Sequence, residues 1–494
     1  MLMKREKQVE LLFINPPAFE GQGKFSRENR SAAVTRSGTL YYPLWLIYAA
    51  ALCEQEGFNI AFLDAVANGI STEESLKFVQ KHPSANVVVI DTSTPSIVSD
   101  ISFADKVKSL LPKAFVILVG THPSALAQET LQMGNLFDAV ARREFDQTIV
   151  QIAHAISNGE DPYKVRGISF RTQDKNIVEN PDMSYLQNLD RLPFAAEFIH
   201  RHLDVRQYFF SASAYPEVQI FTSRGCANHC NFCVYPQTMH GHLTRMRSEE
   251  NIVEEFRYIA EKMPEVKEVV IEDDTFTTDQ ERVKRFCELL IASGLNKKLR
   301  WLCNARANLK AETMHMMKMA GCNLVVVGIE SGNQQILNNI RKGIRLEQVR
   351  TFVKDARHTG LRVHACYMVG NRGETKESMN ETLRLAMELN TDTAQFYPLQ
   401  PFPGTEAYQW AKENGYIHGG FSDYCKADGT LNSVLDLPGL SSSDMTSFCD
   451  FARKKYYCRP RYIMRRLWIG LHDIEDLKRS IKAFLNLRHY LYRK

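Results

Sequence analysis

The first 150 residues alternate short apolar runs with stretches of helical spacing. The apolar runs are residues 9–15 (VELLFIN), 59–65 (NIAFLDA), 85–93 (ANVVVIDTS) and 114–120 (AFVILVG). Between the first two, residues 43–57 have helical spacing and end at Gly57. Continuous apolar strands linked by helices are typical of a parallel sheet that is covered on both faces. We therefore predict an α/β, doubly wound (Rossmann-like) domain over residues 1–150.

A second series of strands and helices begins near residue 213. Its apolar strands are residues 218–223, 268–273, 299–305, 323–330, 362–370 and 393–400. Six strands that alternate with helices predict a partial (β/α)6 barrel over residues 213–405, smaller than the full eight-unit barrel. Residues 151–212 contain turn dipeptides between short strands and are expected to form a connector, whereas residues 406–494 are expected to be mostly helical.

The bulk composition is that of a globular protein. The chain has 494 residues, of which 44% are hydrophobic and 24% charged, with a net charge of +4. This charge is too small to indicate a nucleic-acid partner. Because no apolar stretch reaches about 18 residues, the sequence predicts no membrane span, and we expect a cytoplasmic protein that is at most peripheral to the inner face of a membrane.

Three of the 11 cysteines lie in one short segment, CANHCNFC. Cys226, Cys230 and Cys233 have the spacing C-x3-C-x2-C, and three such thiolates can each bind one iron of a [4Fe–4S] cluster. The fourth iron then stays open to a small molecule. A zinc site is the alternative and would need a fourth ligand. The candidates for that ligand are His229, His240 and His242.

The loop directly after the first barrel strand resembles the signature of the radical S-adenosylmethionine (SAM) superfamily, and later strand ends resemble the SAM motifs of that family in the same order. The resemblance implies a [4Fe–4S] cluster that binds SAM, and a reductant such as flavodoxin or ferredoxin whose electron cleaves SAM to a 5′-deoxyadenosyl radical. The residues implied as SAM contacts are Asp273, Asp274, Arg306, Glu330, Ser331, Gly370 and Glu374. We assign no catalytic acid, base or nucleophile.

The N-terminal segments LLFINPP, ILVGTHPSAL and VARREFDQT resemble the cobalamin-binding domain of the cobalamin-dependent radical SAM class. No G-x-G-x-x-G or P-loop motif competes with this interpretation. The resemblance implies cobalamin contacts from Thr92, Ser93, Gly120 and Thr121. The corrinoid motif D-x-H-x-x-G is matched only by its histidine, His122, so the resemblance implies a cobalt without a protein histidine and a structural role for His122.

Two segments, residues 233–248 and 328–345, resemble the hopanoid biosynthesis-associated members of this class. That resemblance implies modification of a hopanoid head group by cyclitol ether formation. The alternatives in the same class are a cobalamin-dependent C-methyltransferase and an anaerobic magnesium-protoporphyrin IX monomethyl ester cyclase. A non-catalytic corrinoid-binding protein is a different kind of alternative, but it would have no use for an open iron.

The C-terminal residues 452–494 are strongly basic, with 13 Lys and Arg against three Asp and Glu. Aromatic residues, among them Trp468, Phe484, Tyr490 and Tyr492, are interleaved with the cations. A basic aromatic helix suits an anionic membrane surface, and this pattern would fit a lipid-linked substrate as well as a small molecule. The alternative is a basic helix that packs on the barrel.

Overall fold

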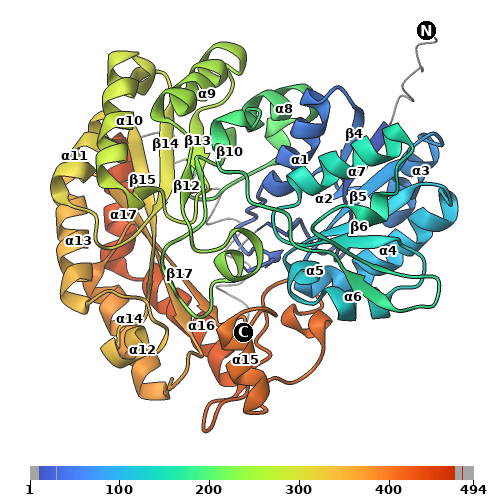
Figure 1. The fold of residues 1–494 in the computed structure, drawn as a ribbon. Helices are drawn as coiled ribbons and strands as arrows, with labels where there is room; N and C mark the ends of the chain where they lie inside the picture. Colours follow the sequence, from blue (N-terminus) through green and yellow to red (C-terminus); the bar gives the residue numbers. More distant parts are fainter. Residues whose placement is uncertain (1–9, 29–30, 473–480, 482–494) are drawn as a thin grey trace.

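The computed structural model describes residues 10–28, 31–472 and 481. Two sheets lie side by side, one in the N-terminal part (blue to cyan in Figure 1) and one in the middle of the chain (green to orange). Helices cover both, which confirms the predicted α/β class. No helix in the described part of the chain is long and apolar enough to cross a membrane.

The first sheet has seven strands in the order β4-β1-β5-β6-β7-β8-β9. Its strands are β1 (Glu10–Asn15), β4 (Asn59–Asp64), β5 (Val87–Thr92), β6 (Phe115–Gly120), β7 (Ala139–Ala141), β8 (Ile168–Arg171) and β9 (Ile177–Glu179). The strands from β4 to β7 are parallel, whereas β8 and β9 add to the edge in antiparallel pairing. Part of the segment expected as a connector therefore extends the first sheet.

Alternate side chains of the central strands enter two separate cores. In β1, Leu11 and Phe13 belong to one core, while Leu12 and Ile14 belong to the other. The first core includes α1 and α7, and the second includes α3 and α4. These helices are α1 (Leu44–Gln55), α3 (Thr72–Gln80), α4 (Ile97–Leu110) and α7 (Asp146–Asn158). Because successive side chains of a strand point to opposite faces, a strand buried on both sides has to be apolar at every position.

The second sheet is an open, fully parallel half barrel of six strands in chain order. Its strands are β10 (Glu217–Ile220), β13 (Glu268–Ile271), β14 (Arg300–Ala305), β15 (Cys322–Glu330), β16 (Arg362–Val369) and β17 (Thr393–Pro398). The helices on its outer face are α9 (Glu249–Lys262), α10 (Gln280–Ala292), α11 (Ala311–Met319), α13 (Leu346–Thr359) and α14 (Lys376–Leu389) (Figure 1). The carboxyl ends of parallel strands lie at one edge, where barrel active sites are found.

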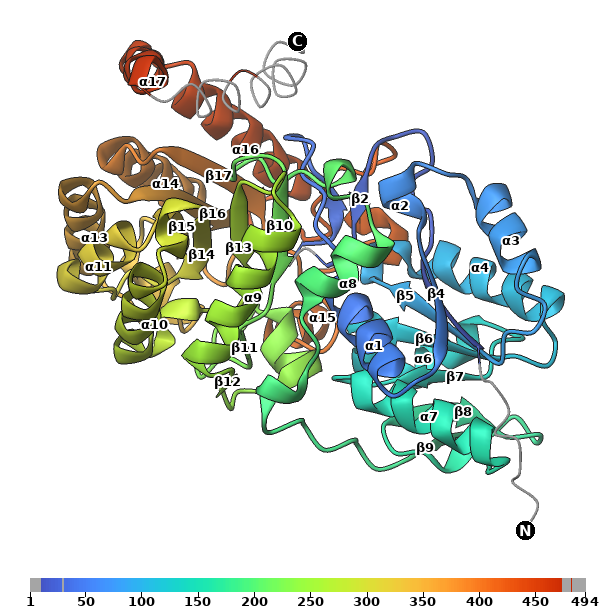
Figure 2. The same cartoon turned by 90° about the horizontal axis from the view of Figure 1, so that it is seen from above.

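The C-terminal segment contacts both sheets. It contains α15 (Glu406–Glu413), the short helix η8 (Phe421–Tyr424), α16 (Ser442–Tyr457) and α17 (Pro460–His472). The helix α16 packs on β17, and Figure 2 shows α16 and α17 above the second sheet. On the other side, the backbone amide of Val34 in the N-terminal part donates to the carbonyl of Gly429 at 2.8 Å. This segment is thus a wall shared by the two halves of the protein.

Gly120 ends β6 beside the end of β5, and this position accepts no side chain. Its φ is +119°, and a Cβ atom would lie 2.3 Å from the carbonyl oxygen of Thr92. We expect Gly120→Ala to lower the free energy of unfolding by more than about 2 kcal/mol, because backbone strain and a backbone clash add. Gly159→Ala is the matched control: φ is +73°, but a Cβ there would have nothing within 4 Å. Urea unfolding monitored by circular dichroism measures the effect. If the two variants have equal unfolding midpoints, the predicted clash at Gly120 is contradicted.

Candidate active site

The three clustered cysteines lie on a loop that a small antiparallel ribbon holds in place. The ribbon pairs β11 (Ser223–Arg224) with β12 (Arg245–Met246). Gly225, between the ribbon and the first cysteine, has φ +93°, and a Cβ there would lie 2.1 Å from the carbonyl oxygen of Leu243. Only glycine allows the two backbone segments to lie this close, so the backbone is fixed in position where the cysteine loop begins.

The thiols of Cys226, Cys230 and Cys233 are not in disulfides, and all three residues line one cavity of about 860 Å³. Asn228 donates its side-chain amide to the Cys226 sulfur at 3.3 Å, and Arg306 Nη1 is 4.0 Å from the Cys230 sulfur. Hydrogen bonds to the sulfur ligands are among the contacts that tune an iron–sulfur cluster. The described residues contain no three His, Cys, Asp or Glu side chains that converge on one ion. A cubane needs no such convergence, because each thiolate binds a different iron.

The histidines considered as zinc ligands have other partners. His240 Nε2 is 2.8 Å from Asp274 Oδ2, and the His240 ring stacks on Trp45 at 5.7 Å. The Nδ1 atom of His242 is 3.1 Å from the carbonyl oxygens of Cys226 and Asn228. This geometry favours a [4Fe–4S] cluster over zinc at the three cysteines.

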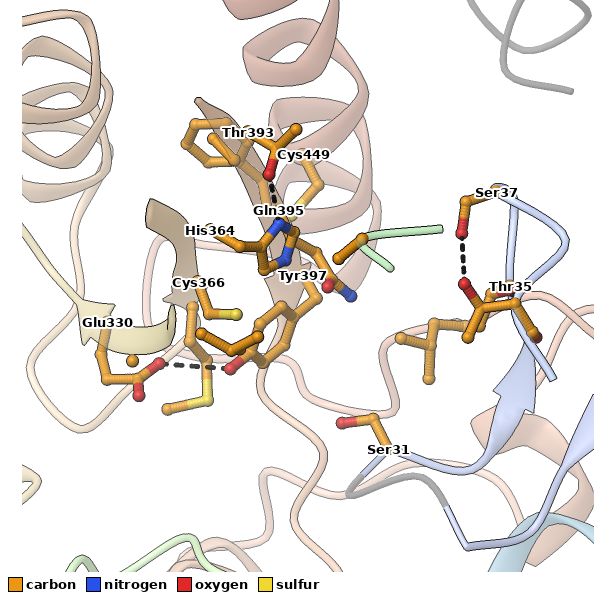
Figure 3. A pocket seen from close by; sticks show the side chains of 18 of the residues that line it. Ser31, Thr35, Ser37, Glu330, His364, Cys366, Thr393, Gln395, Tyr397 and Cys449 are labelled. Atoms are coloured by element: carbon orange, nitrogen blue, oxygen red, sulfur yellow. Dashed lines mark hydrogen bonds between the residues drawn. The ribbon is translucent and has the colours of Figure 1, made fainter. Parts of the chain in front are cut away.

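Glu330 faces the cavity near the cysteines (Figure 3). Its Oε1 atom is 2.7 Å from Lys342 Nζ, and Tyr397 donates its hydroxyl to Oε2 at 3.2 Å. Burial lowers the pKa of Lys342, but the negative charges of Glu330 and Cys230 together raise it above its ordinary value, so this lysine stays charged. Glu330 has the left-handed φ of +67°, and a Cβ at Gly328 would lie 2.1 Å from Glu330 Oε1. The strand end is therefore strained in order to hold this carboxylate.

Asp274, Arg306 and Glu330 line the cavity, as the SAM expectation requires. Lys342 and Tyr397 complete this group and were missed by sequence reasoning. Lys342 lies 12 residues after Glu330, beyond α12 (Gln334–Asn339), and no motif marks it. Polar groups of both signs beside an open iron could hold the amino acid part and the ribose of SAM, and the volume of the cavity leaves room for a second molecule.

Asp273, which the resemblance puts near the SAM amino group, directs its carboxylate to the backbone before the cysteine loop. Its carboxylate accepts hydrogen bonds from the backbone amides of Thr222 and Ser223 at 2.6 and 3.0 Å, and from both hydroxyls at 2.6 Å. The side chain is buried and does not belong to the cavity lining. Asp273 thus fixes the chain that leads into the cysteine loop, and its direct contact with SAM stays a prediction.

Three further expected SAM contacts also lie outside the cavity lining. Ser331 pairs its hydroxyl with that of Thr382 in α14 at 3.2 Å. A Cβ at Gly370 would lie 2.5 Å from the sulfur of Met445 in α16. Glu374 accepts a hydrogen bond from the Ser378 hydroxyl in the first turn of α14, and burial raises the pKa of Glu374. These contacts attach helices to the strand ends, and a direct contact of the three residues with SAM stays a prediction.

The residues expected to contact cobalamin come together at the ends of β5 and β6, where Thr92 is paired with Gly120. Thr92 donates its hydroxyl to the Val119 carbonyl at 2.7 Å, and Ser93 pairs with Ser96 at 2.8 Å. Thr121 begins the helix α5 (Thr121–Ala125). None of the four lines the large cavity. Instead η8 of the C-terminal segment packs against this edge, at η1 (Thr94–Ser96).

His122 is completely enclosed at that edge. Its Nδ1 atom is 3.2 Å from Thr94 Oγ1, and its ring meets Phe421 of η8 edge-on at 4.6 Å. Burial lowers its pKa to about 3, so the ring is neutral. His122 Nε2 and Asp91 Oδ2 are buried and have no hydrogen-bond partner among the described residues. Such atoms call for a polar ligand, and the amide side chains of cobalamin can both donate and accept.

Comparisons with known proteins match both halves of the chain. The family model described as "B12 binding domain" matches residues 30–153, and the model described as "Radical SAM superfamily" matches residues 220–386. A protein from Pyrococcus horikoshii, named as an uncharacterized methyltransferase, is 27% identical over 97% of this chain and 99% of its own. The cytidylyl-2-hydroxyethylphosphonate methyltransferase of Streptomyces wedmorensis is 25% identical over 86% of this chain and 89% of its own.

Because Glu330 and Asp273 have different environments, we expect their substitution to impair different properties, SAM binding in one case and iron content in the other. Glu330→Gln should weaken SAM binding about ten- to a hundredfold, because a charge-assisted contact is lost, while the iron content stays unchanged. Asp273→Ala should lower the iron content, since the four bonds that hold the start of the cysteine loop are lost. Iron analysis and equilibrium dialysis with labelled SAM measure the two effects, with Cys226→Ala as the reference for cluster loss. An Asp273→Ala protein with full iron content and weakened SAM binding would show instead that Asp273 contacts SAM.

The fold comparison agrees with the domain matches. The radical S-adenosylmethionine methyltransferase TsrM from Kitasatospora setae, with cobalamin and a [4Fe–4S] cluster bound, superposes with a TM-score of 0.68 at 16% identity. The superposition covers 91% of this chain and 89% of that one. With the cysteine loop, the polar cavity beside it and the two matched domains, this chain is a B12-dependent radical SAM enzyme that uses a [4Fe–4S] cluster, SAM and cobalamin.

Proposed function

We propose that this enzyme transfers a methyl group from SAM to a small-molecule substrate. The observation that carries the proposal is that both halves of the chain match over nearly full length a relative named as a methyltransferase. When bound, the cluster supplies an electron for SAM cleavage and cobalamin supplies a carrier for a methyl group. The cavity of about 860 Å³ between the cysteines and the C-terminal helices would hold SAM and substrate together.

The residues of this chain have positioning roles in that reaction. Arg306 and Lys342 place two positive charges beside Cys230, where they would orient the SAM carboxylate. Glu330 would accept hydrogen bonds from SAM, and Tyr397 together with Lys342 keeps its carboxylate in place. An electron donor such as flavodoxin or ferredoxin has to deliver the electron.

Methyl transfer is supported better than the hopanoid cyclitol ether reaction, which rests only on the resemblance of two sequence segments. Only methyl transfer removes the methyl group of SAM. SAM that loses its methyl group becomes S-adenosylhomocysteine, whereas SAM that is cleaved reductively gives 5′-deoxyadenosine and methionine. The same distinction separates methyl transfer from an oxidative ring closure of the cyclase kind.

The holoprotein, incubated with reductant and SAM but without substrate, should therefore form about one S-adenosylhomocysteine per bound cobalamin, because the carrier can accept one methyl group. Liquid chromatography with mass detection measures both products of SAM. Protein prepared without cobalamin is the control and should form none. If the holoprotein forms 5′-deoxyadenosine but no S-adenosylhomocysteine, the enzyme is not a methyltransferase.

We also propose a peripheral membrane contact through the basic C-terminal residues 452–494. The proposal rests on their charge pattern, and Phe484, Tyr490 and Tyr492 lie outside the described residues. Full-length protein should co-sediment with anionic vesicles at low salt and be released by 0.5 M salt, because the screening length then falls to a few Å. Truncation after Phe451 is the matched variant. Equal sedimentation of the two proteins would contradict the contact.

A further inference from the structure

The cavity beside the cysteines extends away from them along β16 and β17 to the C-terminal helices. Figure 3 shows this region, with Glu330 at one side, His364 and Gln395 in the middle, and Thr35 and Ser37 of the N-terminal part opposite. The end near the cysteines contains both acidic and basic side chains. The far end contains four cations, and among the described residues that line it there is no carboxylate. The four are Arg36, Lys426, Arg453 and Arg466.

Arg453 is the central cation of this set. Its Nη2 atom donates to the carbonyl of Phe396 in β17 at 2.9 Å, which holds the guanidinium at the cavity wall. Its Nη1 atom and that of Arg36 both bond to the same oxygen of Asp450. Burial lowers the pKa of Arg453, and the charge of Arg36 lowers it further. A single carboxylate that two guanidinium groups share leaves a positive potential at this end.

Two acids close to these cations, Asp450 and Asp428, do not line the cavity. Asp450 lies on α16, half of its side chain is exposed, and it does not line the cavity. Asp428 accepts a hydrogen bond from the backbone amide of Thr430 at 3.0 Å and also lies outside the lining. The cavity wall at this end thus presents cations, whereas these two carboxylates lie behind it. Arg36 comes from the N-terminal part of the chain and the other three cations come from the C-terminal segment, so the fold brings them together.

The walls between the two ends are largely apolar and aromatic. Phe396, Leu399, Tyr457, Tyr462 and Ile463 contribute to them. A few polar groups interrupt this surface, such as His364, whose Nδ1 atom is 2.7 Å from Thr393 Oγ1. Pockets with apolar walls and a small number of charged groups bind ligands by burying an apolar body and by orienting it through its polar end.

We propose that the substrate of this enzyme is an amphiphilic small molecule with an anionic oxygen group, a carboxylate or a phosphate, that binds to Arg453 and Arg36. The apolar body lies along β16 and β17, and the opposite end of the molecule reaches the cysteine loop. The fork of a guanidinium matches the two oxygens of either anion. This inference rests on the proposed methyl transfer for the use of the cavity and adds the substrate class to it.

Three soluble probes that share one apolar body test the proposal: 1-naphthyl phosphate, 1-naphthoate and the uncharged 1-naphthol. Calorimetric titration uses the full chain loaded with cluster, cobalamin and SAM. At least one of the two anions should bind about tenfold or more tightly than 1-naphthol, because charge-assisted bonds are gained. The stronger of the two identifies phosphate or carboxylate as the preferred group. If neither anion binds more tightly than 1-naphthol, the proposal is overturned.

Variants locate the anion. Arg453→Gln and Arg36→Gln should each reduce the preference for the anion to about twofold or less, because one arm of the fork is lost. Lys454→Gln removes the same charge from an exposed position of the same helix that does not line the cavity, and it should keep the preference. Asp450→Asn should tighten anion binding, because it removes the negative charge beside the two arginines. Damage to the fold would weaken binding rather than tighten it. An unchanged preference in both arginine variants would also overturn the proposal.

The titration does not depend on methyl transfer, so the two proposals fail separately. S-adenosylhomocysteine formation, measured on the same preparations, reports on methyl transfer. A protein that forms it but shows no preference for an anion retains the proposed function and loses the substrate class. A protein that prefers the anion but forms only 5′-deoxyadenosine keeps the anionic site and loses methyl transfer.

Discussion

The guanidinium of Arg224 is buried between the two sheets, directly before the glycine that starts the cysteine loop, with 1% of its side chain exposed. Its Nη1 atom is 2.6 Å from Asp146 and 3.3 Å from Glu144, both in the N-terminal part of the chain. Its Cζ atom lies over the ring of Trp45, 4.6 Å from the ring centroid. A buried charge is tolerated only with such partners, and removal of one partner typically costs about 3–5 kcal/mol. The position of the cluster loop is therefore linked to the docking of the N-terminal domain.

This linkage has a chemical consequence. The proposed methyl transfer needs its two cofactors at a fixed separation, because small displacements are costly to such a reaction. In this chain the cysteine loop and the B12-binding domain are joined by charge pairs that exist only when the two domains are docked. Tyr42 of the N-terminal part adds a hydrogen bond from its hydroxyl to the Glu217 carbonyl of β10 at 2.9 Å. Several buried polar contacts thus make the interface specific rather than merely apolar.

The cavity depends both on a strained backbone position at Glu330 and on the packing of distant chain segments. Glu330 has a backbone conformation that costs about 1–3 kcal/mol for a residue with a side chain. The ion pair with Lys342 and the bond from Tyr397 offset this cost and point the carboxylate into the cavity. The far wall is built by the C-terminal helices, and the segment that contains them also reaches the N-terminal domain through Phe421 and Gly429. Three parts of the chain therefore decide which molecule fits.

The sequence by itself determined the features that depend on local spacing. Apolar runs of strand length predicted both sheets, because a strand covered on two faces must be apolar throughout. The spacing of Cys226, Cys230 and Cys233 predicted the cluster loop, since three thiolates within eight residues can reach one cubane. The antiparallel extension of the first sheet by β8 and β9 was not predicted, because short edge strands carry little pattern.

Only the tertiary structure decided the partners of individual polar residues. Asp273 and Asp274 are neighbours in sequence, yet one holds the Thr222–Ser223 backbone and the other pairs with His240 and lines the cavity. The meeting of Arg36 with Arg453 at Asp450 and the contact of Phe421 with His122 each join segments that are hundreds of residues apart. Periodicity states which face of an element is buried, but not which distant element covers it. A hydrogen bond or an ion pair acts over only a few ångströms, so its partners are set by how the elements pack.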